Sequence, residues 1–466
     1  MAAADLGTTT SRQLPRRISG ALASGSVLQP LNSSMIAVAM VAIAAQFGSS
    51  SSLPWVIAGL YIATAVAGPV AGKLGTLFGP RRVYLAGLAM IVLGSVIGLC
   101  TPTLGWLIAS RIIVGVGTAA QYPTAMTILR RYSRDLGIQP RKAVALLVIG
   151  SQATVALGPT ICGLLVGFLG WKAVMWINFP VVALSVFALL RWVERDERID
   201  RLSSGRIVAS LDLPGIALFL VSVVSLMTFL LTGSPWWLLA VFGVSLVALA
   251  FWEWRVAEPF IDIRTLVSNK AITDTMVRTL LTYTAFYAIY YSFPQWWQAA
   301  RSLSPAASGL MMFPLAVLAI VSTLTASKVC AQAGPRRALL IGAGAIAITG
   351  ILMVVVASHA SPIAALVVVA AIAGIPSGFN NIGNQSVIEE STSDTEVGTV
   401  IGLYRTTQYI GANLAAVALH LLGGAPISNH GFGNLGYFIA ACGAGVIVVT
   451  LLSKSLHPSR FSNGRA

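Results

Sequence analysis

The stretch GKLGTLFGPRR at residues 72–82 returns as SKVCAQAGPRR at residues 327–337, and this repeat decides how the chain is organised. Five positions are identical in the two copies: Lys73, Gly79, Pro80, Arg81 and Arg82 match Lys328, Gly334, Pro335, Arg336 and Arg337. Internal self-similarity indicates a chain built from repeated units. We therefore expect the two copies to form equivalent turns in two halves of one structure.

The composition excludes a soluble protein. Of 466 residues, 56% are hydrophobic and only 10% are charged, against about 25% charged in soluble domains. Apolar runs long enough to cross a bilayer recur along the whole chain. We count fourteen, with starts near residues 22, 54, 82, 104, 143, 172, 209, 235, 271, 305, 336, 362, 395 and 432. The predicted fold class is an all-α membrane protein without strands.

The basic residues predict the orientation. The net charge is +15, and the Lys and Arg residues gather in every second gap between spans, as Arg81 and Arg82 do after the second span. Retained basic residues mark the cytoplasmic side of short loops. Only the gap at residues 389–396, EESTSDTE, lacks them. We expect both termini in the cytoplasm, a multi-pass position in a bacterial inner membrane, and no nucleic-acid partner.

The repeat divides the chain into two six-helix halves. We expect a cytoplasmic tail, an N-terminal half, a linker with two inserted helices, a C-terminal half and a second tail at residues 1–17, 18–193, 194–256, 257–454 and 455–466. Parallel repeats of this kind belong to transporters whose substrate site lies between the halves, near the bilayer midplane.

Four motifs carry a resemblance to a known family. They are the repeated loop, RIIVGVGTAA at residues 111–120, LGPTICG at residues 157–163 and GWKAVMWINFP at residues 170–180. With them the chain resembles a major facilitator superfamily transporter, specifically the fourteen-helix drug:proton antiporters. The resemblance implies two six-helix bundles plus two inserted central helices, and proton-driven export of lipophilic, cationic small molecules by alternating access.

Two positions depart from that family. Its loop motif usually has an acidic residue where this chain has Thr76, and its first helix often has an aspartate where this chain has Asn32. In the family, the loop acid caps a charge network between the halves and the helix 1 carboxylate is a candidate proton carrier. Thr76 and Asn32 carry no carboxylate, so neither takes over these roles. For Asn32 we expect either a contact with the cavity or a hydrogen bond between helices.

Two arginines inside apolar spans are coupling or binding candidates, because buried arginine requires a partner or an aqueous cavity. Arg111 matches the family's helix 4 arginine, which the resemblance implicates in proton transfer or gating. A hydrogen-bonding anchor between helices is the equal alternative. Arg405, about ten residues into the thirteenth span, is expected near mid-depth, in contact with substrate or with the other half.

Few acidic residues are available to carry a proton. Asp274 lies four residues before Arg278, so we expect an ion pair along one helix face or a coupling role. Asp212 precedes Leu213, Pro214 and Gly215, and this order predicts a helix N-cap.

Polar and aromatic side chains inside the spans are the substrate-binding candidates. Tyr283, Tyr287 and Tyr290 form a helical stripe that can stack on flat cations or simply pack between helices. Trp296 and Trp297 after them can mark the outer membrane interface. A second group is expected to face a central cavity or to join helices: Gln121, Tyr122, Gln152, Asn380, Asn381, Asn384 and Gln385.

Gating is expected at two places. Gly158 and Pro159 should supply close packing and a bend at the moving interface. The repeated turn, with Gly79, Arg81, Arg82, Arg336 and Arg337, should hold the inner gate and bind anionic lipid head groups.

No enzyme, metal or cofactor is expected. The four cysteines, Cys100, Cys162, Cys330 and Cys442, show no paired ligand spacing, and GVGTAA lies inside a span and not in a phosphate-binding loop. We predict a monomeric secondary exporter whose partners are a small-molecule substrate, protons and membrane lipids. The alternative is a narrow exporter or facilitator of one metabolite or lipid without direct proton antiport.

Overall fold

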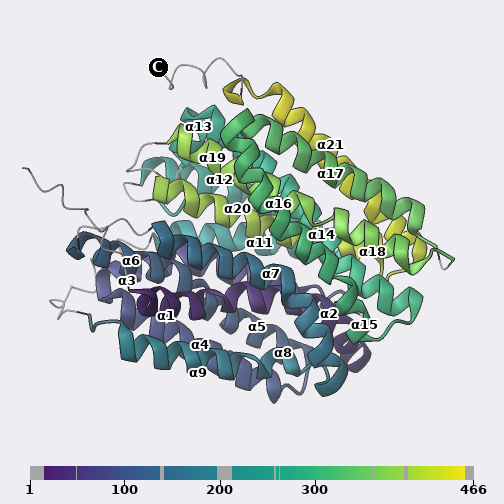
Figure 1. Cartoon of the computed structure of the whole chain (residues 1–466), viewed down its shortest axis with the longest axis horizontal. Helices are drawn as coiled ribbons and strands as arrows, with labels where there is room; N and C mark the ends of the chain where they lie inside the picture. The colour runs from purple at the N-terminus through teal and green to yellow at the C-terminus, as the bar shows by residue number, and fades with distance from the viewer. Residues whose placement is uncertain are drawn as a thin grey trace, which may run out of the picture.

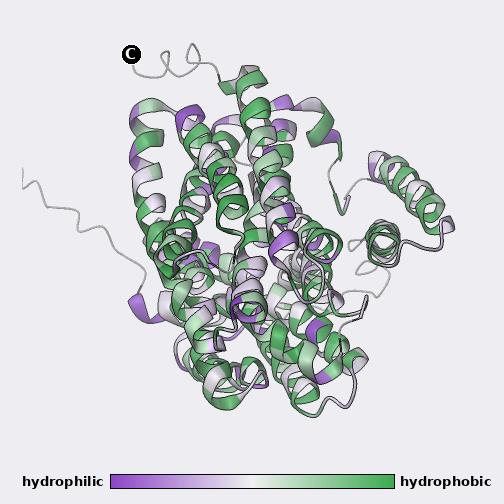
Figure 2. Ribbon diagram, turned by 90° about the vertical axis from the view of Figure 1, so that its right-hand side faces the viewer, coloured by the Kyte–Doolittle hydropathy of each residue, from purple (hydrophilic) through white to green (hydrophobic). Residues whose placement is uncertain are grey.

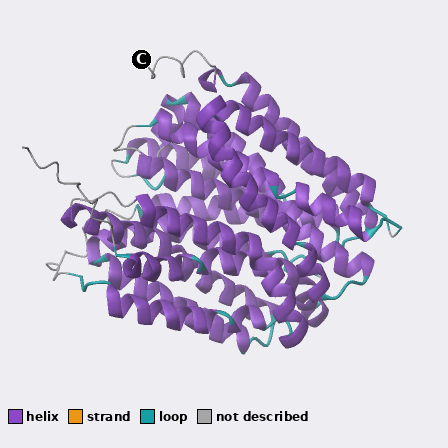
Figure 3. Cartoon of the chain, viewed as in Figure 1, coloured by secondary structure: helices purple, strands orange, loops and turns teal. Residues whose placement is uncertain are grey.

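The computed structural model describes residues 15–48, 50–136, 141–196, 212–256, 259–261, 263–358, 360–392 and 397–456. All regular elements in these ranges are helices (Figure 3). The prediction of an all-α chain is therefore confirmed for the part that the structure describes. Of the expected tails at residues 1–17 and 455–466, residues 1–14 and 457–466 lie outside it, and α1 already begins at Arg16.

The helices form two bundles joined by a hairpin (Figure 1). The first bundle contains α1 (Arg16–Ser26), α2 (Leu28–Phe47), α3 (Trp55–Phe78), α4 (Pro80–Leu99), α5 (Leu104–Ala119), α6 (Gln121–Leu136), α7 (Arg141–Leu169), α8 (Ala173–Trp176) and α9 (Asn178–Trp192). The hairpin contains α11 (Leu213–Thr232) and α12 (Trp237–Arg255). The second bundle contains α13 (Ile263–Ser268), α14 (Lys270–Arg301), α15 (Pro305–Met311), α16 (Phe313–Ala333), α17 (Pro335–Val356), α18 (Ile363–Ile372), α19 (Ile375–Ser391), α20 (Val397–Ala418), a π-helical turn (Leu419–Gly423), α21 (Asn429–Leu452) and a 3₁₀ turn (Lys454–Leu456).

Several predicted spans consist of two consecutive helices. Breaks occur between α1 and α2, α5 and α6, α8 and α9, α15 and α16, and α18 and α19. Each break is followed within a few residues by a proline, as Pro30 follows the break at Val27 and Pro123 follows the break at Ala120. Proline removes one hydrogen bond and clashes with the preceding turn, so the backbone changes direction there without leaving the span.

Twelve helical stretches of the described chain are long and apolar enough to cross a membrane. The predicted count of fourteen is not confirmed. The other two long helices, α14 with 32 residues and α20 with 22, are the ones that carry Asp274, Arg278 and Arg405 together with many tyrosines and threonines.

The inserted hairpin stands at the edge of the molecule. Figure 2 shows it beside the two bundles, and α12 is the least buried of the twelve candidate spans, with 22% of its most apolar stretch enclosed by the protein. Large apolar side chains cover its outside, for example Val244 and Val247. An apolar exterior of this size fits lipid as the surrounding medium.

The two copies of the repeat form equivalent turns, as predicted. Gly79 ends α3 at φ +95° and Gly334 ends α16 at φ +78°. Pro80 and Pro335 then begin α4 and α17, where proline is tolerated because the first helical N–H has no partner. We call the end of the molecule that holds these turns the GPRR end, and the opposite end the far end.

Candidate functional site

A cation–aromatic contact joins the two bundles. The guanidinium carbon of Arg405 in α20 lies 3.8 Å from the ring centre of Tyr122 in α6. Tyr409, one turn further along α20, also reaches this guanidinium. Arg405, Tyr122 and Tyr409 are all half-buried. Within the described residues no carboxylate lies at ion-pair distance from Arg405, so its nearest partners are neutral phenols.

Tyrosines from both bundles surround this contact. The Tyr291 hydroxyl donates to the Tyr61 hydroxyl at 2.8 Å, and the Tyr61 ring centre lies 5.2 Å from that of Tyr287. The Tyr290 hydroxyl donates to the carbonyl of Val155 in α7. Tyr287 and Tyr290 therefore pack between the two bundles. This position agrees with the interpretation of the tyrosine stripe as helix packing.

The remaining members of the stripe differ in exposure. Tyr283 is half-buried and meets Tyr404 edge to face, with ring centres 6.5 Å apart. Trp296 and Trp297 are buried, and Trp296 donates to Asn429 at 3.0 Å. The interpretation that the two tryptophans mark the outer interface is therefore wrong.

The amide cluster of α19 points in two directions. Asn381 Oδ1 accepts from Gln385 at 2.9 Å and from Tyr404 at 3.0 Å, and lies 3.5 Å from the Tyr283 hydroxyl. Asn380, by contrast, lies against Gly342 of α17. Successive helical residues are turned by about 100°, so the four amides do not share one cavity face.

Arg278 has neutral partners inside the second bundle. Its Nε donates to Asn384 Oδ1 at 3.1 Å and its Nη2 to Thr275 Oγ1 at 2.7 Å. Asp274 accepts instead from Ser453 at 2.7 Å. The predicted ion pair along α14 is thus not formed, because the two side chains turn to different neighbouring segments.

Arg111 and Asn32 belong to the interior of the first bundle. The Arg111 Nη2 donates to the Asn32 carbonyl at 2.8 Å and its Nε to the Val56 carbonyl at 3.3 Å. The Asn32 amide exchanges hydrogen bonds with the Asn178 amide at 2.7 and 3.0 Å. Both residues are fully buried, and these contacts are those of anchors between helices.

The two predicted glutamines take different positions. Gln121 is fully buried and donates to the carbonyls of Gly117 at 3.1 Å and Tyr84 at 3.3 Å, so it does not reach the other bundle. Gln152 of α7 is half-buried, and its amide has no hydrogen bond within the described chain.

At the far end, α7 contacts the second bundle through backbone atoms at glycine positions. Thr160 donates to the Gly309 carbonyl at 2.9 Å. A Cβ at Gly309 would lie 2.6 Å from the Pro159 carbonyl and 2.8 Å from the Gly163 Cα. On the other side of α7, a Cβ at Gly158 would meet the Ser34 hydroxyl of α2. The Gly-Pro motif therefore packs closely within its bundle and across to the other.

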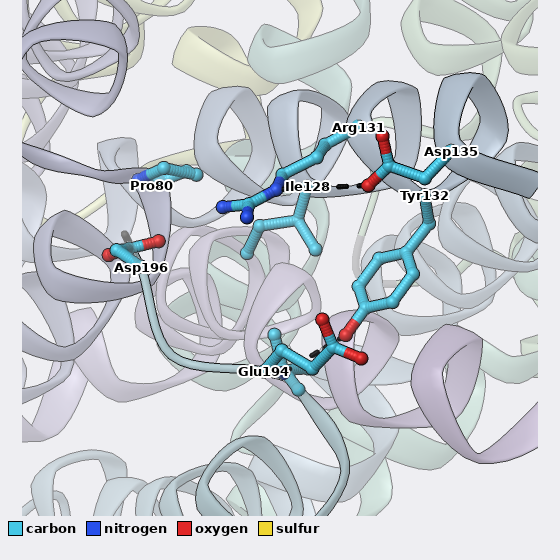
Figure 4. Close-up of a pocket in the computed structure, with 8 residues that line it drawn as sticks. Pro80, Ile128, Arg131, Tyr132, Asp135, Glu194 and Asp196 are labelled. Atoms are coloured by element: carbon cyan, nitrogen blue, oxygen red, sulfur yellow. Dashed lines mark hydrogen bonds and ion pairs between the residues drawn. The ribbon is translucent and has the colours of Figure 1, made fainter. Parts of the chain in front are cut away.

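At the GPRR end, Asp196 holds the start of α4 (Figure 4). Its carboxylate accepts from the backbone N–H groups of Arg81 at 3.3 Å and Arg82 at 2.9 Å. Thr76 bonds only its own helix, at the Lys73 carbonyl. The hollow beside Asp196 measures about 10 Å³, no larger than one water. The sequence analysis missed Asp196, although it lies in the charged stretch that follows α9.

The fixed charges are separated along the molecule. The acidic residues that the structure describes lie near the GPRR end: Asp135, Glu194, Asp196, Asp212, Glu253, Asp274, Glu389 and Glu390. Arg111, Arg278 and Arg405 lie further inside the bundles. Among the described residues no cluster of three His, Cys, Asp or Glu side chains is arranged to hold a metal. The interior is therefore electropositive, and its arginines have mainly neutral partners.

Comparison with known proteins identifies the family. A family model described as Major Facilitator Superfamily matches residues 22–416 and, again, 275–465. The uncharacterized MFS-type transporter YwoD of Bacillus subtilis is 30% identical over 440 residues, which cover 94% of this chain and 96% of that protein.

Two further relatives have names that state a function. Multidrug resistance protein 3 of Bacillus subtilis is 26% identical over 80% of this chain and 73% of its own length. The Tetracenomycin C resistance and export protein of Streptomyces glaucescens is 29% identical over 69% and 60%. Among solved structures, a POT family transporter in complex with 5-aminolevulinic acid has a TM-score of 0.69 at 14% identity, covering 94% of this chain and 95% of that one. At that identity the likeness concerns the fold alone.

Proposed function

Because this chain belongs to the Major Facilitator Superfamily, we propose that it exports lipophilic, drug-like small molecules across the membrane by alternating access. The observation that carries the proposal is the far-end contact, where the Gly-Pro motif of α7 meets Gly309 without any charge across the interface. Backbones that touch without fixed charges can separate at low cost. Relatives named for multidrug resistance and for antibiotic export favour an exporter.

The membrane topology is part of this proposal. We place α14 and α20 among the spans because they run beside α21 and α3 through the middle of the assembly, which gives fourteen transmembrane helices. The GPRR end then faces the cytoplasm of a bacterial inner membrane, since it holds Arg81, Arg82, Arg336 and Arg337. These arginines are the candidates for contact with anionic lipid head groups. The functional unit is a monomer.

Export is driven by the proton gradient in this proposal, although none of the carboxylates that the structure describes lies in the middle of the molecule. The described acids, such as Asp274 and Glu253, lie near the GPRR end, and a proton has to enter and leave through groups of this kind. Arg111 and Arg278 hold the bundles rigid around the central contact. The expectation of cationic cargo rests on the aromatic stripe alone, and Arg405 already occupies the face of Tyr122.

The test is dye efflux from a pump-deficient bacterial host that expresses the chain. Cells are loaded with a cationic, a neutral and an anionic lipophilic dye, and efflux is followed with and without a protonophore. We expect efflux of at least one dye, and its loss when the gradient collapses. Efflux that survives the protonophore would contradict proton coupling. Absence of efflux for all three dyes would contradict drug export and point to a narrow metabolite or lipid.

A further inference from the structure

We propose that Arg405 and Tyr122 form a binding site for organic anions, in which an acidic group on an aromatic, apolar body pairs with the guanidinium between the two bundles. The inference rests on the proposed transport function and names the substrate class. The preferred acidic group is a carboxylate, because its two oxygens match the planar fork of arginine.

The geometry leaves donors available on Arg405. One face of the guanidinium lies on the Tyr122 ring at 3.8 Å, and a stacked guanidinium keeps its N–H groups in its own plane. Arginine has five such donors and no acceptor. Its described neighbours are the phenols of Tyr122 and Tyr409, which cannot balance its charge.

Accessibility distinguishes Arg405 from the other interior arginines. Arg111 and Arg278 are 0% exposed and donate to backbone or side-chain oxygens of their own bundles. Arg405 is half-buried and faces the opposite bundle. Of the three, Arg405 is therefore the one whose side chain is partly accessible. An unpaired charge away from water is costly, and an anionic ligand removes that cost.

The surroundings fit an aromatic body and oppose a cation. Tyr283 and Tyr287 lie within electrostatic reach of Arg405 and offer flat apolar surface. Gln385 and Asn381 add amide groups beside Tyr283. A cation at the same place would meet Arg405 without a described carboxylate beside it, so like charges would repel.

The test uses two probes with one ring system and opposite charge, 2-naphthoate and 2-naphthylmethylammonium. Full-length purified protein in a neutral detergent is titrated with each probe by calorimetry. We expect wild-type protein to bind 2-naphthoate at least tenfold more tightly. Arg405→Ala should weaken 2-naphthoate binding by about tenfold or more, the loss expected for one charged hydrogen-bond partner. It should not weaken binding of the ammonium probe.

Two control variants separate charge from structure. Arg405→Lys keeps the charge without the fork, so we expect an affinity between those of wild type and Arg405→Ala. Arg134→Ala removes an exposed arginine of α6 at the GPRR end and should leave both affinities unchanged. If Arg405→Ala does not fold, the inference is still tested by which of the two probes the wild-type protein binds more tightly.

Three outcomes would overturn the inference. They are tighter binding of the ammonium probe by wild type, unchanged 2-naphthoate affinity in a folded Arg405→Ala protein, and displacement of 2-naphthoate by equimolar inorganic phosphate, which would indicate a general anion site. Binding in detergent does not depend on export. Naphthoate binding without dye efflux in cells would thus support the anion site and contradict the proposed exporter. Efflux of cationic dyes alone would support the exporter and contradict the anion site.

Discussion

Gly79 and Gly334 occupy the same position in the two copies of the repeat, yet their surroundings differ. Both have positive φ, which costs an alanine about 1–2 kcal/mol. A Cβ at Gly79 would lie 2.4 Å from Asp196 Oδ2, whereas a Cβ at Gly334 would meet nothing within 4 Å. We expect Gly79→Ala to destabilise the protein by about 1 kcal/mol more than Gly334→Ala, because Asp196 must then leave the α4 N-terminus.

The measurement is thermal unfolding of both variants in detergent. The control is the same pair in an Asp196→Gly background, because a Cβ at Gly79 would also lie 2.7 Å from the Asp196 Cβ, which alanine would keep. With the whole side chain absent, the two glycine substitutions should cost the same. A difference that persists in that background would show that Asp196 is not its cause.

At the residue scale, the sequence predicts which polar groups are buried but seldom their partners. The Asp212 cap was predicted and is confirmed, since it depends on residues three positions apart. Asn178, which pairs with Asn32 from 146 positions away, could not be found from local spacing. The Asp274 and Arg278 spacing allowed an ion pair, but Ser453 and Asn384 lie closer to those side chains in the folded chain.

Among the elements, the inserted hairpin is held by two buried carboxylates. Glu253 of α12 accepts from the Ile261 N–H at 3.2 Å, and Asp212 makes more contacts. Asp212 accepts from Gly215 N–H at 3.1 Å, from Trp252 Nε1 at 2.7 Å and from Phe260 N–H at 2.9 Å. It thus ties the start of α11 to the end of α12 and to the segment that leads into the second bundle. We expect Asp212→Ala to lower stability by about 1–3 kcal/mol, because buried donors lose their acceptor.

Thermal unfolding in detergent measures this loss. Asp135→Ala is the matched control, since Asp135 is exposed and its ion pair with Arg131 is long, at 3.9 Å. Trp252→Phe removes one of the three donors and should cost less than Asp212→Ala. An equal cost for Asp135→Ala and Asp212→Ala would refute the special role of this carboxylate.

The helical elements were largely predictable because each span must satisfy its own backbone hydrogen bonds in lipid. Span starts near residues 209 and 235 correspond to α11 and α12, which begin at Leu213 and Trp237. The breaks inside the spans were not predicted, although Pro30 and Pro123 are visible in the sequence. A proline shows that a helix is perturbed, and only packing decides whether it bends or is divided.

For the whole molecule, the repeat predicted two related bundles, and Figure 1 shows both. It did not predict which faces meet. That depends on small residues such as Gly163 and Gly309, and the sequence contains 44 glycines without marking those that touch another helix. The candidate site has the same limitation: Arg405 and Tyr122 were predicted separately, and only the fold places one on the other.

The far-end contact should control which end of the molecule is open. A Cβ at Gly309 would lie within 3 Å of backbone atoms of Pro159 and Gly163, which cannot move aside as a side chain would. We therefore expect Gly309→Ala to separate α7 from α15 and to reduce efflux severalfold. The reporter is Ala156→Cys in a protein whose four native cysteines are replaced, because Ala156 of α7 is 3% exposed and packs against Ala316 and Ala319 of α16 without taking part in the Thr160–Gly309 hydrogen bond. Its labelling by a water-soluble maleimide should become faster in the Gly309→Ala protein.

Gly344→Ala in α17 is the control for this experiment, since a Cβ there meets nothing within 4 Å. It should change neither labelling nor efflux. Faster labelling with Gly309→Ala alone would mean that the far-end contact closes the molecule on that side, and that loosening it disturbs the balance between two conformations. Unchanged labelling, with the protein folded, would mean that the bundles absorb a methyl group there and that another contact holds this end closed.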